Sequence, residues 1–324
     1  MNRSRLAVVV FGPLPIVAAS LGITNWWRPG GTAVVSGNHV LHAEEPKAPA
    51  GASHVAGDLA HDLRHRLETQ CAQTGAALRP RLGAECSVLV RSPFVVAGDL
   101  TERQLLDWYE RTIAPASRAL GHAYFDKSPS APITILLFSG EQSYNRFAKH
   151  LFGEEGISVY GYYKSDQRTL VMNIETGGGT LVHELTHALV DFDFPQIPDW
   201  FNEGLASLYE QCRFLPDDAG LEGLPNWRLP GLQEAIRQKR IRSLAQLISD
   251  DDFRGRDVAL NYAQARYFCL FLQERKLLEE FYRRFRAAHS DDSRGLQTAL
   301  GLFAPKTWEQ VDHEYQEWVL TLQR

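Results

Sequence analysis

The chain has 324 residues, of which 44% are hydrophobic and 23% are charged, a balance typical of soluble globular proteins. This composition excludes a polytopic membrane protein, a fully disordered chain and a fibrous repeat. There are 34 Lys and Arg residues against 39 Asp and Glu residues, which gives a formal net charge of −5. A mildly acidic chain without a long basic run is a poor binder of nucleic acid, so we expect no nucleic-acid partner.

The first 24 residues have the pattern of an export signal. Arg3 and Arg5 precede an apolar run over residues 6–23, and such a pattern is typical of a segment whose following chain is exported. Prolines inside the run favour a cleaved signal peptide, whereas Trp26 and Trp27 favour an uncleaved membrane anchor. A buried N-terminal helix or strand is a third alternative. We expect residues 1–24 to be a signal peptide or anchor, and the rest of the chain to be extracytoplasmic, with possible membrane association through this segment.

The remaining chain divides into three stretches. Residues 25–58 predict a flexible linker, because they are rich in Gly, Ala, Pro, His and Ser without a period. Residues 59–179 alternate between helical and strand patterns, with helices at 59–79, 101–124 and 141–151 and strands at 87–96, 133–138, 159–163 and 169–174. Later patterns are helical, at 180–191, 199–211, 230–239, 244–248, 258–273, 277–288 and 306–322. We predict one α+β domain over residues 59–324, with a mixed sheet in 87–179 and a mostly helical part in 180–324.

Four cysteines are too few for a disulfide scaffold, but export makes disulfide bonds possible. Pairing them in chain order gives Cys71–Cys86 and Cys212–Cys269 as the expected bridges. Four buried thiols are the alternative, because free cysteine is often buried. The sequence leaves both alternatives open.

A metal-binding signal lies at His183-Glu184-Leu185-Thr186-His187, an H-E-x-x-H motif. On a helix the two histidines share one face and lie roughly 6 Å apart, so that both imidazoles can point at one ion. Glu184 lies about 100° round the helix, where it can accept a proton from a water that Zn²⁺ activates. Apolar residues around the motif form the opposite face of the helix, which would be buried in the core. We therefore predict a zinc site rather than a chance spacing.

A catalytic zinc ion needs a third protein ligand and an open position. Glu203 lies on the next predicted helix, after a connection with two prolines that can turn the chain back across the first helix. Gly204 would let the two helices approach closely. We predict that Glu203 completes a His₂Glu ligand set, and that the alternative, a surface glutamate, is the weaker interpretation beside H-E-x-x-H.

These motifs resemble those of the gluzincins, the thermolysin-like clan of zinc metallopeptidases, in which a glutamate on the next helix completes the ligand set. A closer resemblance is to an uncharacterised bacterial family in the peptidase MA-like superfamily. The resemblance covers about residues 92–288. It is carried by the stretches 161–163 (GYY), 169–173 (TLVMN), 176–187 (TGGGTLVHELTH), 200–207 (WFNEGLAS), 226–229 (NWRL) and 262–267 (YAQARY).

The resemblance implies a zincin-like fold, a peptide or protein substrate and two further roles. The strand before the metal helix would pair with an extended peptide, which makes Thr169, Val171 and Asn173 candidate substrate-binding residues; an ordinary internal strand is the alternative. Gluzincins also use a downstream Tyr or His to stabilise the oxyanion. Tyr262, near the start of a predicted helix, is the candidate here, with a buried core aromatic as the alternative.

One position departs from the gluzincin pattern. Many members carry an aspartate four residues after the glutamate ligand, where it orients a zinc histidine, but this chain has Ser207 there. Orientation of the histidines would then come from elsewhere, with Asp191 or a backbone carbonyl as candidates. This departure slightly favours the alternative function, a zincin-fold binding module at the cell envelope that cleaves nothing. Retention of Glu184 opposes it, because metal binding alone does not need that carboxylate.

Other motifs give weaker signals. His61 and His65 are also four residues apart, but they lack an apolar back, so a solvated helix is the better interpretation. Gly-x-Ser-x-Gly, P-loop and Gly-x-Gly-x-x-Gly motifs are missing from the sequence, which leaves serine hydrolases, kinases and dinucleotide enzymes without support. The prediction is a zinc peptidase in which Glu184 is the general base. Hydrolysis of a non-peptide amide shares this site, and the sequence does not define an oligomeric state.

Overall fold

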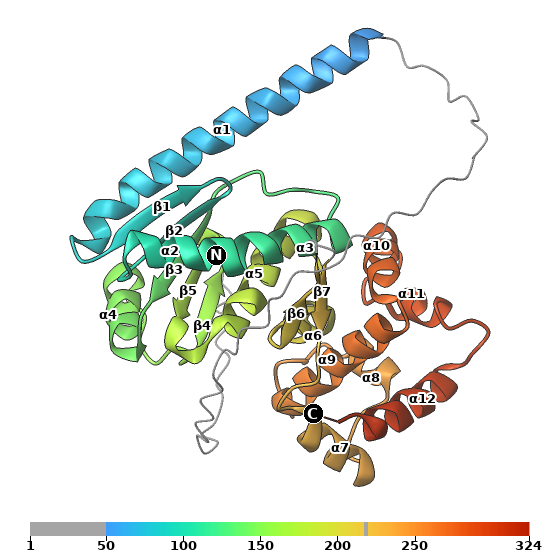
Figure 1. Cartoon of the computed structure of the whole chain (residues 1–324). Helices are drawn as coiled ribbons and strands as arrows, with labels where there is room; N and C mark the ends of the chain where they lie inside the picture. Colours follow the sequence, from blue (N-terminus) through green and yellow to red (C-terminus); the bar gives the residue numbers. More distant parts are fainter. Residues whose placement is uncertain (1–49, 217–219, 324) are drawn as a thin grey trace, which may run out of the picture.

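A computed structural model describes residues 50–216 and 220–323 (Figure 1). The predicted export segment, residues 1–24, and linker residues 25–49 lie outside the described residues. Among the helices of the described part, none combines the length and the apolar character that crossing a membrane requires. The described chain folds as predicted into an α+β structure, with a mixed sheet first and a helical part after it.

The sheet has five strands in the order β1-β2-β3-β5-β4. β2, β3 and β5 are parallel, whereas β1 pairs antiparallel with β2 at one edge and β4 pairs antiparallel with β5 at the other. The predicted strand 87–96 is two strands, because the chain turns at Ser92 and Pro93. The strands are β1 (Ser87–Arg91), β2 (Phe94–Gly98), β3 (Ile133–Phe138), β4 (Gly161–Lys164) and β5 (Thr169–Asn173).

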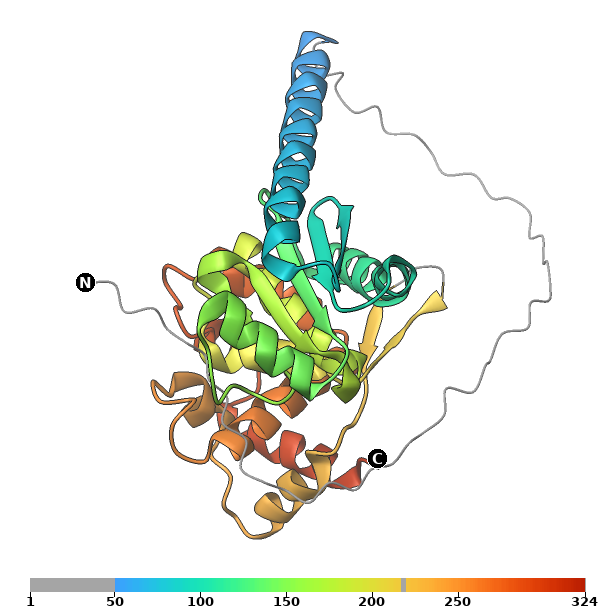
Figure 2. The same cartoon turned by 90° about the vertical axis from the view of Figure 1, so that its left-hand side faces the viewer.

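Helices cover both faces of the sheet (Figure 2). One face packs on α1 (Ala50–Leu82) and α4 (Glu141–Phe152), through a core that includes Cys71, Phe138 and Tyr144. The other face packs on α2 (Glu102–Trp108), a π-helical turn (Tyr109–Ile113), α3 (Ala114–Tyr124) and α5 (Gly178–Asp193). Thr101 caps α2 and Gly153 ends α4. The central strands are buried on both faces, and alternate residues along each of them contribute to one core or the other.

Helix α1 is longer than the sequence indicated. It begins at Ala50 rather than at residue 59, so residues 50–58 of the predicted linker are helical. Its C-terminal part packs on the sheet through Cys71, Leu78 and Leu82, whereas its N-terminal part extends away from the body of the molecule (Figures 1 and 2). His61 and His65 lie on this exposed part, which confirms the interpretation as a solvated helix.

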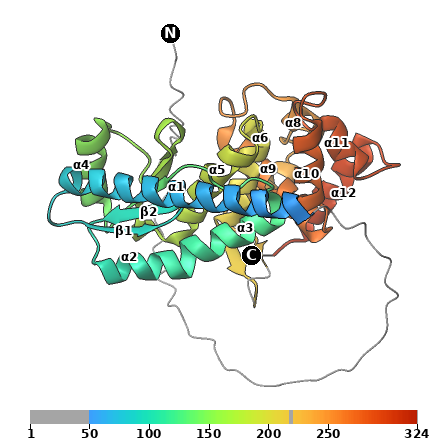
Figure 3. The same ribbon diagram turned by 90° about the horizontal axis from the view of Figure 1, so that it is seen from above.

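The helical part follows α5 and lies beside the sheet, at the end of the molecule opposite α4 (Figure 3). The sequence missed the hairpin of β6 (Cys212–Phe214) and β7 (Leu221–Gly223), whose strands of three residues are too short to show a period. It also missed the six-residue helix α11 (Leu296–Gly301). The helices are α6 (Asp199–Tyr209), α7 (Leu229–Arg237), α8 (Leu244–Ser249), α9 (Val258–Glu274), α10 (Leu278–Ala288), α11 (Leu296–Gly301) and α12 (Trp308–Thr321).

The predicted disulfide bonds are wrong, since all four cysteines are free thiols. Cys71 lies beside Ser92, just after β1, whereas Cys86 directly precedes that strand. The five residues of β1 separate Cys86 from Ser92, and the extended chain from one to the other spans about 20 Å. Cys269 packs against the middle of α6, whereas Cys212 begins β6 beyond the end of that helix. The alternative prediction, four buried thiols, is correct for Cys71 and Cys269, whereas the other two cysteines are half-buried.

Asp193 holds the end of α5 in place. One carboxylate oxygen accepts the backbone N–H groups of Asp126 and Lys127, each at 2.9 Å, and the other accepts the Tyr282 hydroxyl at 3.0 Å and pairs with Arg286. These contacts connect α5 to the loop after α3 and to α10. The Asp193 side chain is fully buried, so its charge depends entirely on these partners.

We expect Asp193→Ala to lower the free energy of unfolding by about 3–5 kcal/mol, because it leaves the buried Tyr282 hydroxyl and two backbone N–H groups without their acceptor. Urea unfolding followed by circular dichroism measures this change. Asp166→Ala is the matched control, since Asp166 is exposed on a surface turn. Equal stability of the two variants would contradict the role assigned to Asp193.

Candidate metal centre

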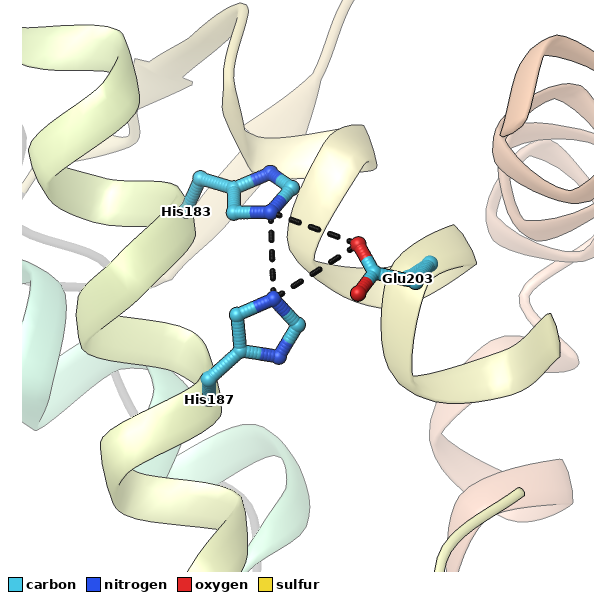
Figure 4. Close-up of side chains that lie close together, drawn as sticks. All are labelled: His183, His187 and Glu203. Atoms are coloured by element: carbon cyan, nitrogen blue, oxygen red, sulfur yellow. Dashed lines mark hydrogen bonds and ion pairs between the residues drawn. The ribbon is translucent and has the colours of Figure 1, made fainter. Parts of the chain in front are cut away.

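The predicted metal ligands come together from two helices (Figure 4). His183 and His187 lie one turn apart on α5, and Glu203 lies on α6, which follows after a short turn. Their side chains are nearly buried, with 10%, 11% and 3% of their surface exposed, respectively. The structure thus places a buried His-His-Glu group where it could bind a metal ion.

A glycine allows α5 and α6 to pack closely at this site, but it is not Gly204, the glycine that the sequence indicated. Gly204 faces α9, where an added Cβ would lie 3.0 Å from the Ala265 carbonyl oxygen, so it does not serve the contact between α5 and α6. Gly179 serves that contact instead, since a Cβ there would lie 2.1 Å from the Glu210 carbonyl oxygen. The start of α5 therefore lies directly against the end of α6.

The three candidate ligand atoms face one another. The Nε2 atoms of His183 and His187 are 3.1 Å apart, and Glu203 Oε2 lies 3.5 Å and 3.6 Å from them, respectively. Glu203 Oε2 is buried and has no hydrogen-bond partner among the described residues. A buried carboxylate oxygen without a partner is costly, so the geometry fits a site that holds a cation.

The Nδ1 atoms of the two histidines face oxygen atoms of other side chains. His187 Nδ1 lies 2.9 Å from Asn202 Oδ1, and His183 Nδ1 lies 3.1 Å from Glu210 Oε1. Both oxygens accept hydrogen bonds, so they favour a hydrogen on Nδ1 of each ring, although the contact of His183 with Glu210 is an ion pair without hydrogen-bond geometry. Nε2 of a neutral ring of this tautomer has a free lone pair. Two nitrogen lone pairs and one carboxylate oxygen therefore converge on one point, as a metal ion requires.

The site stabilises positive charge. Burial by itself would lower the pKa of His183, but the Glu203 and Glu210 carboxylates outweigh it and raise this pKa to about 10. Although burial acts to raise the pKa of Glu203, the two histidines and Arg254 hold it well below its usual range. The carboxylates thus favour a cation between these side chains, whether it is a proton or a metal ion.

Glu184 and Tyr262 border the group of three. Glu184 follows His183 on α5, and burial raises the pKa of its carboxyl while the two histidines oppose the shift. Tyr262 is the fifth residue of α9 and is 2% exposed. Its hydroxyl lies near Glu203 without a hydrogen bond of good geometry, and burial and the Glu203 charge raise its pKa. Both residues therefore lie beside the group of three, and Tyr262 is also a buried aromatic residue of the core, as the alternative interpretation expected.

The predicted peptide-pairing strand is not an edge. β5 lies between β3 and β4, so its backbone groups are already paired on both sides. Thr169, Val171 and Asn173 are buried, and Asn173 donates its side-chain amide to the Val159 carbonyl. The alternative, an internal strand, is confirmed. The edge strand next to β5 is β4, which the sequence also predicted as a strand but did not place in the sheet.

The residues that orient the histidines differ from those suggested by the sequence. Asp191 contacts Tyr163 of β4, and the Ser207 hydroxyl is buried without a partner among the described residues. Asn202 and Glu210 hold the imidazoles instead. Glu210 lies seven residues, or two helical turns, after Glu203, and this spacing is the signal that the sequence analysis missed.

Arg228 holds Glu210 by direct contact, and Arg266 holds the end of α6 that carries it. Arg228 places Nη2 3.2 Å and 3.3 Å from the two carboxylate oxygens of Glu210. Arg266, fully buried on α9, donates to the carbonyls of Leu208 and Leu224, and burial lowers its pKa to about 10. Because Leu208 belongs to the last turn of α6, Arg266 fixes the end of the helix from which Glu210 reaches His183.

Replacing Glu210 should weaken metal binding without removing a ligand. We expect Glu210→Gln to lower metal affinity roughly 10–100-fold, the usual effect of losing a partner that orients a ligand. Competition with a chromophoric chelator measures the affinity. Glu222→Gln is the control, because Glu222 pairs with Arg213 on the surface hairpin. An unchanged affinity for Glu210→Gln would show that His183 needs no such partner.

Comparison with known proteins adds no relative, because a scan against protein-family models and a search of curated proteins both returned no match.

Proposed function

We propose that the chain is a zinc-dependent peptidase of the gluzincin type. The supporting observation is the convergence of His183 Nε2, His187 Nε2 and Glu203 Oε2, with the Glu203 oxygen buried and unpartnered among the described residues. Two imidazoles and one carboxylate are the ligand set of a catalytic zinc site, which keeps a fourth position open. The ligand types favour zinc over Mg²⁺ or Ca²⁺, which prefer oxygen ligands alone.

The residues around the ligands suit amide hydrolysis. When bound, zinc lowers the pKa of a water molecule and polarises the scissile carbonyl. Glu184 takes the proton from the attacking water and passes it to the leaving amine, a role that its raised pKa favours. Tyr262, whose raised pKa keeps its hydroxyl protonated at neutral pH, donates a hydrogen bond to the carbonyl oxygen as negative charge develops there.

β4 is the strand along which we propose that a peptide binds. Asn173 donates its backbone N–H to the Tyr160 carbonyl at 3.0 Å, so alternate residues from Tyr160 onward bond to β5. The backbone groups of Gly161 and Tyr163 then face away from β5, and they have no hydrogen-bond partner among the described residues, so an extended peptide could pair with them. The substrate would run antiparallel or parallel to β4 beside α5.

A binding module without catalysis is the alternative proposal. Its support in the sequence is Ser207, which stands where many gluzincins have the aspartate that orients a histidine. The contact between Glu210 and His183 supplies such a partner by another route, and this weakens that support. We also propose that the protein works outside the cytoplasm, on the basis of the sequence of residues 1–24.

Zinc-dependent cleavage of a peptide library tests the proposal. We expect the full chain without residues 1–24 to cleave peptides, to lose this activity on dialysis against 1,10-phenanthroline, and to regain it when Zn²⁺ is restored. Mass spectrometry of the products identifies the bonds that are cleaved. Binding of peptides without cleavage would favour the binding module, and a metal-free protein would contradict the peptidase.

A further inference from the structure

The two oxygens of Glu203 have different partners. Oε2 faces the histidines, whereas Oε1 lies 2.6 Å from Arg254 Nη2. Arg254 also lies beside Asp199, with 3.4 Å between its Nε and Asp199 Oδ2. Asp199 and Glu203 are one turn apart on α6, so Arg254 bridges two carboxylates on the same face of that helix. No motif in the sequence pointed to Arg254.

The loop that carries Arg254 is held firmly. Phe253 is buried and packs on Tyr262, with 5.4 Å between ring centroids. Asn261, buried on α9, donates its side-chain amide to the carbonyls of Phe253 and Arg256 at 2.8 Å and 3.0 Å. The backbone on both sides of Arg254 is therefore fixed, and its guanidinium is directed at Glu203 before any ligand binds.

Because only one oxygen of Glu203 faces the histidines, the number of bonds that Glu203 can make to a metal ion is restricted. A carboxylate can bind a metal ion through one oxygen or through both. With two histidines, binding through both oxygens would give four protein donors and occupy the position that a catalytic zinc ion keeps open. A guanidinium bonded to Oε1 takes up that oxygen and places a positive charge beside it, which opposes contact between Oε1 and a second cation.

We propose that Arg254 is a positioning residue that keeps Glu203 a one-oxygen ligand and thereby keeps the fourth position on the metal open. This inference rests on the proposed metal chemistry of the site. Arg254 acts through Glu203, and its own side chain is one-third exposed beside the ligand set.

The visible absorption spectrum of the Co²⁺-loaded full chain tests this proposal, because four-coordinate Co²⁺ absorbs far more intensely than five-coordinate Co²⁺. We expect Arg254→Met to lose the intense band and Arg254→Lys to keep it, since an ammonium can still donate to Oε1. We expect Arg256→Met, which removes the same charge from an exposed position on the same loop, to match the wild type. Peptide cleavage by the zinc form of Arg254→Met should fall roughly 10–100-fold in kcat with little change in KM.

An Arg254→Met protein that binds Co²⁺ with the wild-type spectrum would overturn the role of Arg254 and leave the metal site standing. Loss of the intense band in Arg256→Met as well would also overturn it, because the effect would then come from charge on the loop. A wild-type chain that binds no Co²⁺ and no Zn²⁺ would instead overturn the proposed function, and the inference with it. Circular dichroism melting curves confirm that each variant is folded.

Discussion

Glu184→Gln should lower the rate of peptide cleavage by about 10²–10⁴-fold, the usual contribution of a general base. Glutamine has nearly the same shape as glutamate, but it cannot accept the proton of the attacking water. Metal binding should remain, because Glu184 lies beside the His-His-Glu group and is not part of it. The measurements are kcat/KM on a cleaved peptide and zinc content by elemental mass spectrometry.

The control for this prediction is Glu309→Gln, which removes an exposed carboxylate at the start of α12. It should leave both cleavage and zinc content unchanged. If Glu184→Gln cleaves as fast as the wild type, Glu184 is not the base. If the wild type binds peptides as tightly as Glu184→Gln and neither cleaves them, the binding module becomes the better description of the protein.

Glu203→Gln should remove the metal almost completely. The substitution replaces the charged ligand oxygen with a neutral amide oxygen, so the loss of affinity should exceed the roughly 10–100-fold expected when an orienting partner is lost. It also removes the negative charge that raises the pKa of His183, so the empty site becomes less favourable for any cation. Zinc per chain after dialysis, by elemental mass spectrometry, is the decisive measurement.

Glu175→Gln is the matched control for this prediction, because Glu175 lies in the short turn before α5 and is exposed. This variant should keep its zinc. Retention of zinc by Glu203→Gln, in a protein whose melting curve shows it to be folded, would remove Glu203 from the ligand set. The two histidines would then need a different third ligand. Because Glu203 is nearly buried and paired with Arg254, the melting curve is an essential part of this experiment.

The elements of the site were predictable where their signals are local. The spacing of His183 and His187 places both on one face of any helix, and the surrounding apolar residues predict that helix. Glu203 followed because the next helical segment begins after a short connection with two prolines. The structure brings these three side chains together, as the sequence indicated, and confirms the α+β class with its mixed sheet.

Strand order was not predictable in the same way. The patterns of β4 and β5 identify both as strands, but period-2 alternation is the same for an edge strand and its neighbour. Only hydrogen-bond pairing shows that β4 is outermost and that β5 is enclosed between β3 and β4. The disulfide prediction failed for a related reason, since the order of cysteines along the chain does not determine their separation in space.

The sequence by itself determined the metal motif and the type of most elements. Tertiary structure alone decided which residues support the ligands: Glu210 at the end of α6 and Arg254 on the loop before α9. The physical reason is the distance along the chain over which each kind of contact is determined. The backbone period of a helix fixes how residues three or four apart lie, whereas contacts between separate elements depend on how whole helices and loops pack together.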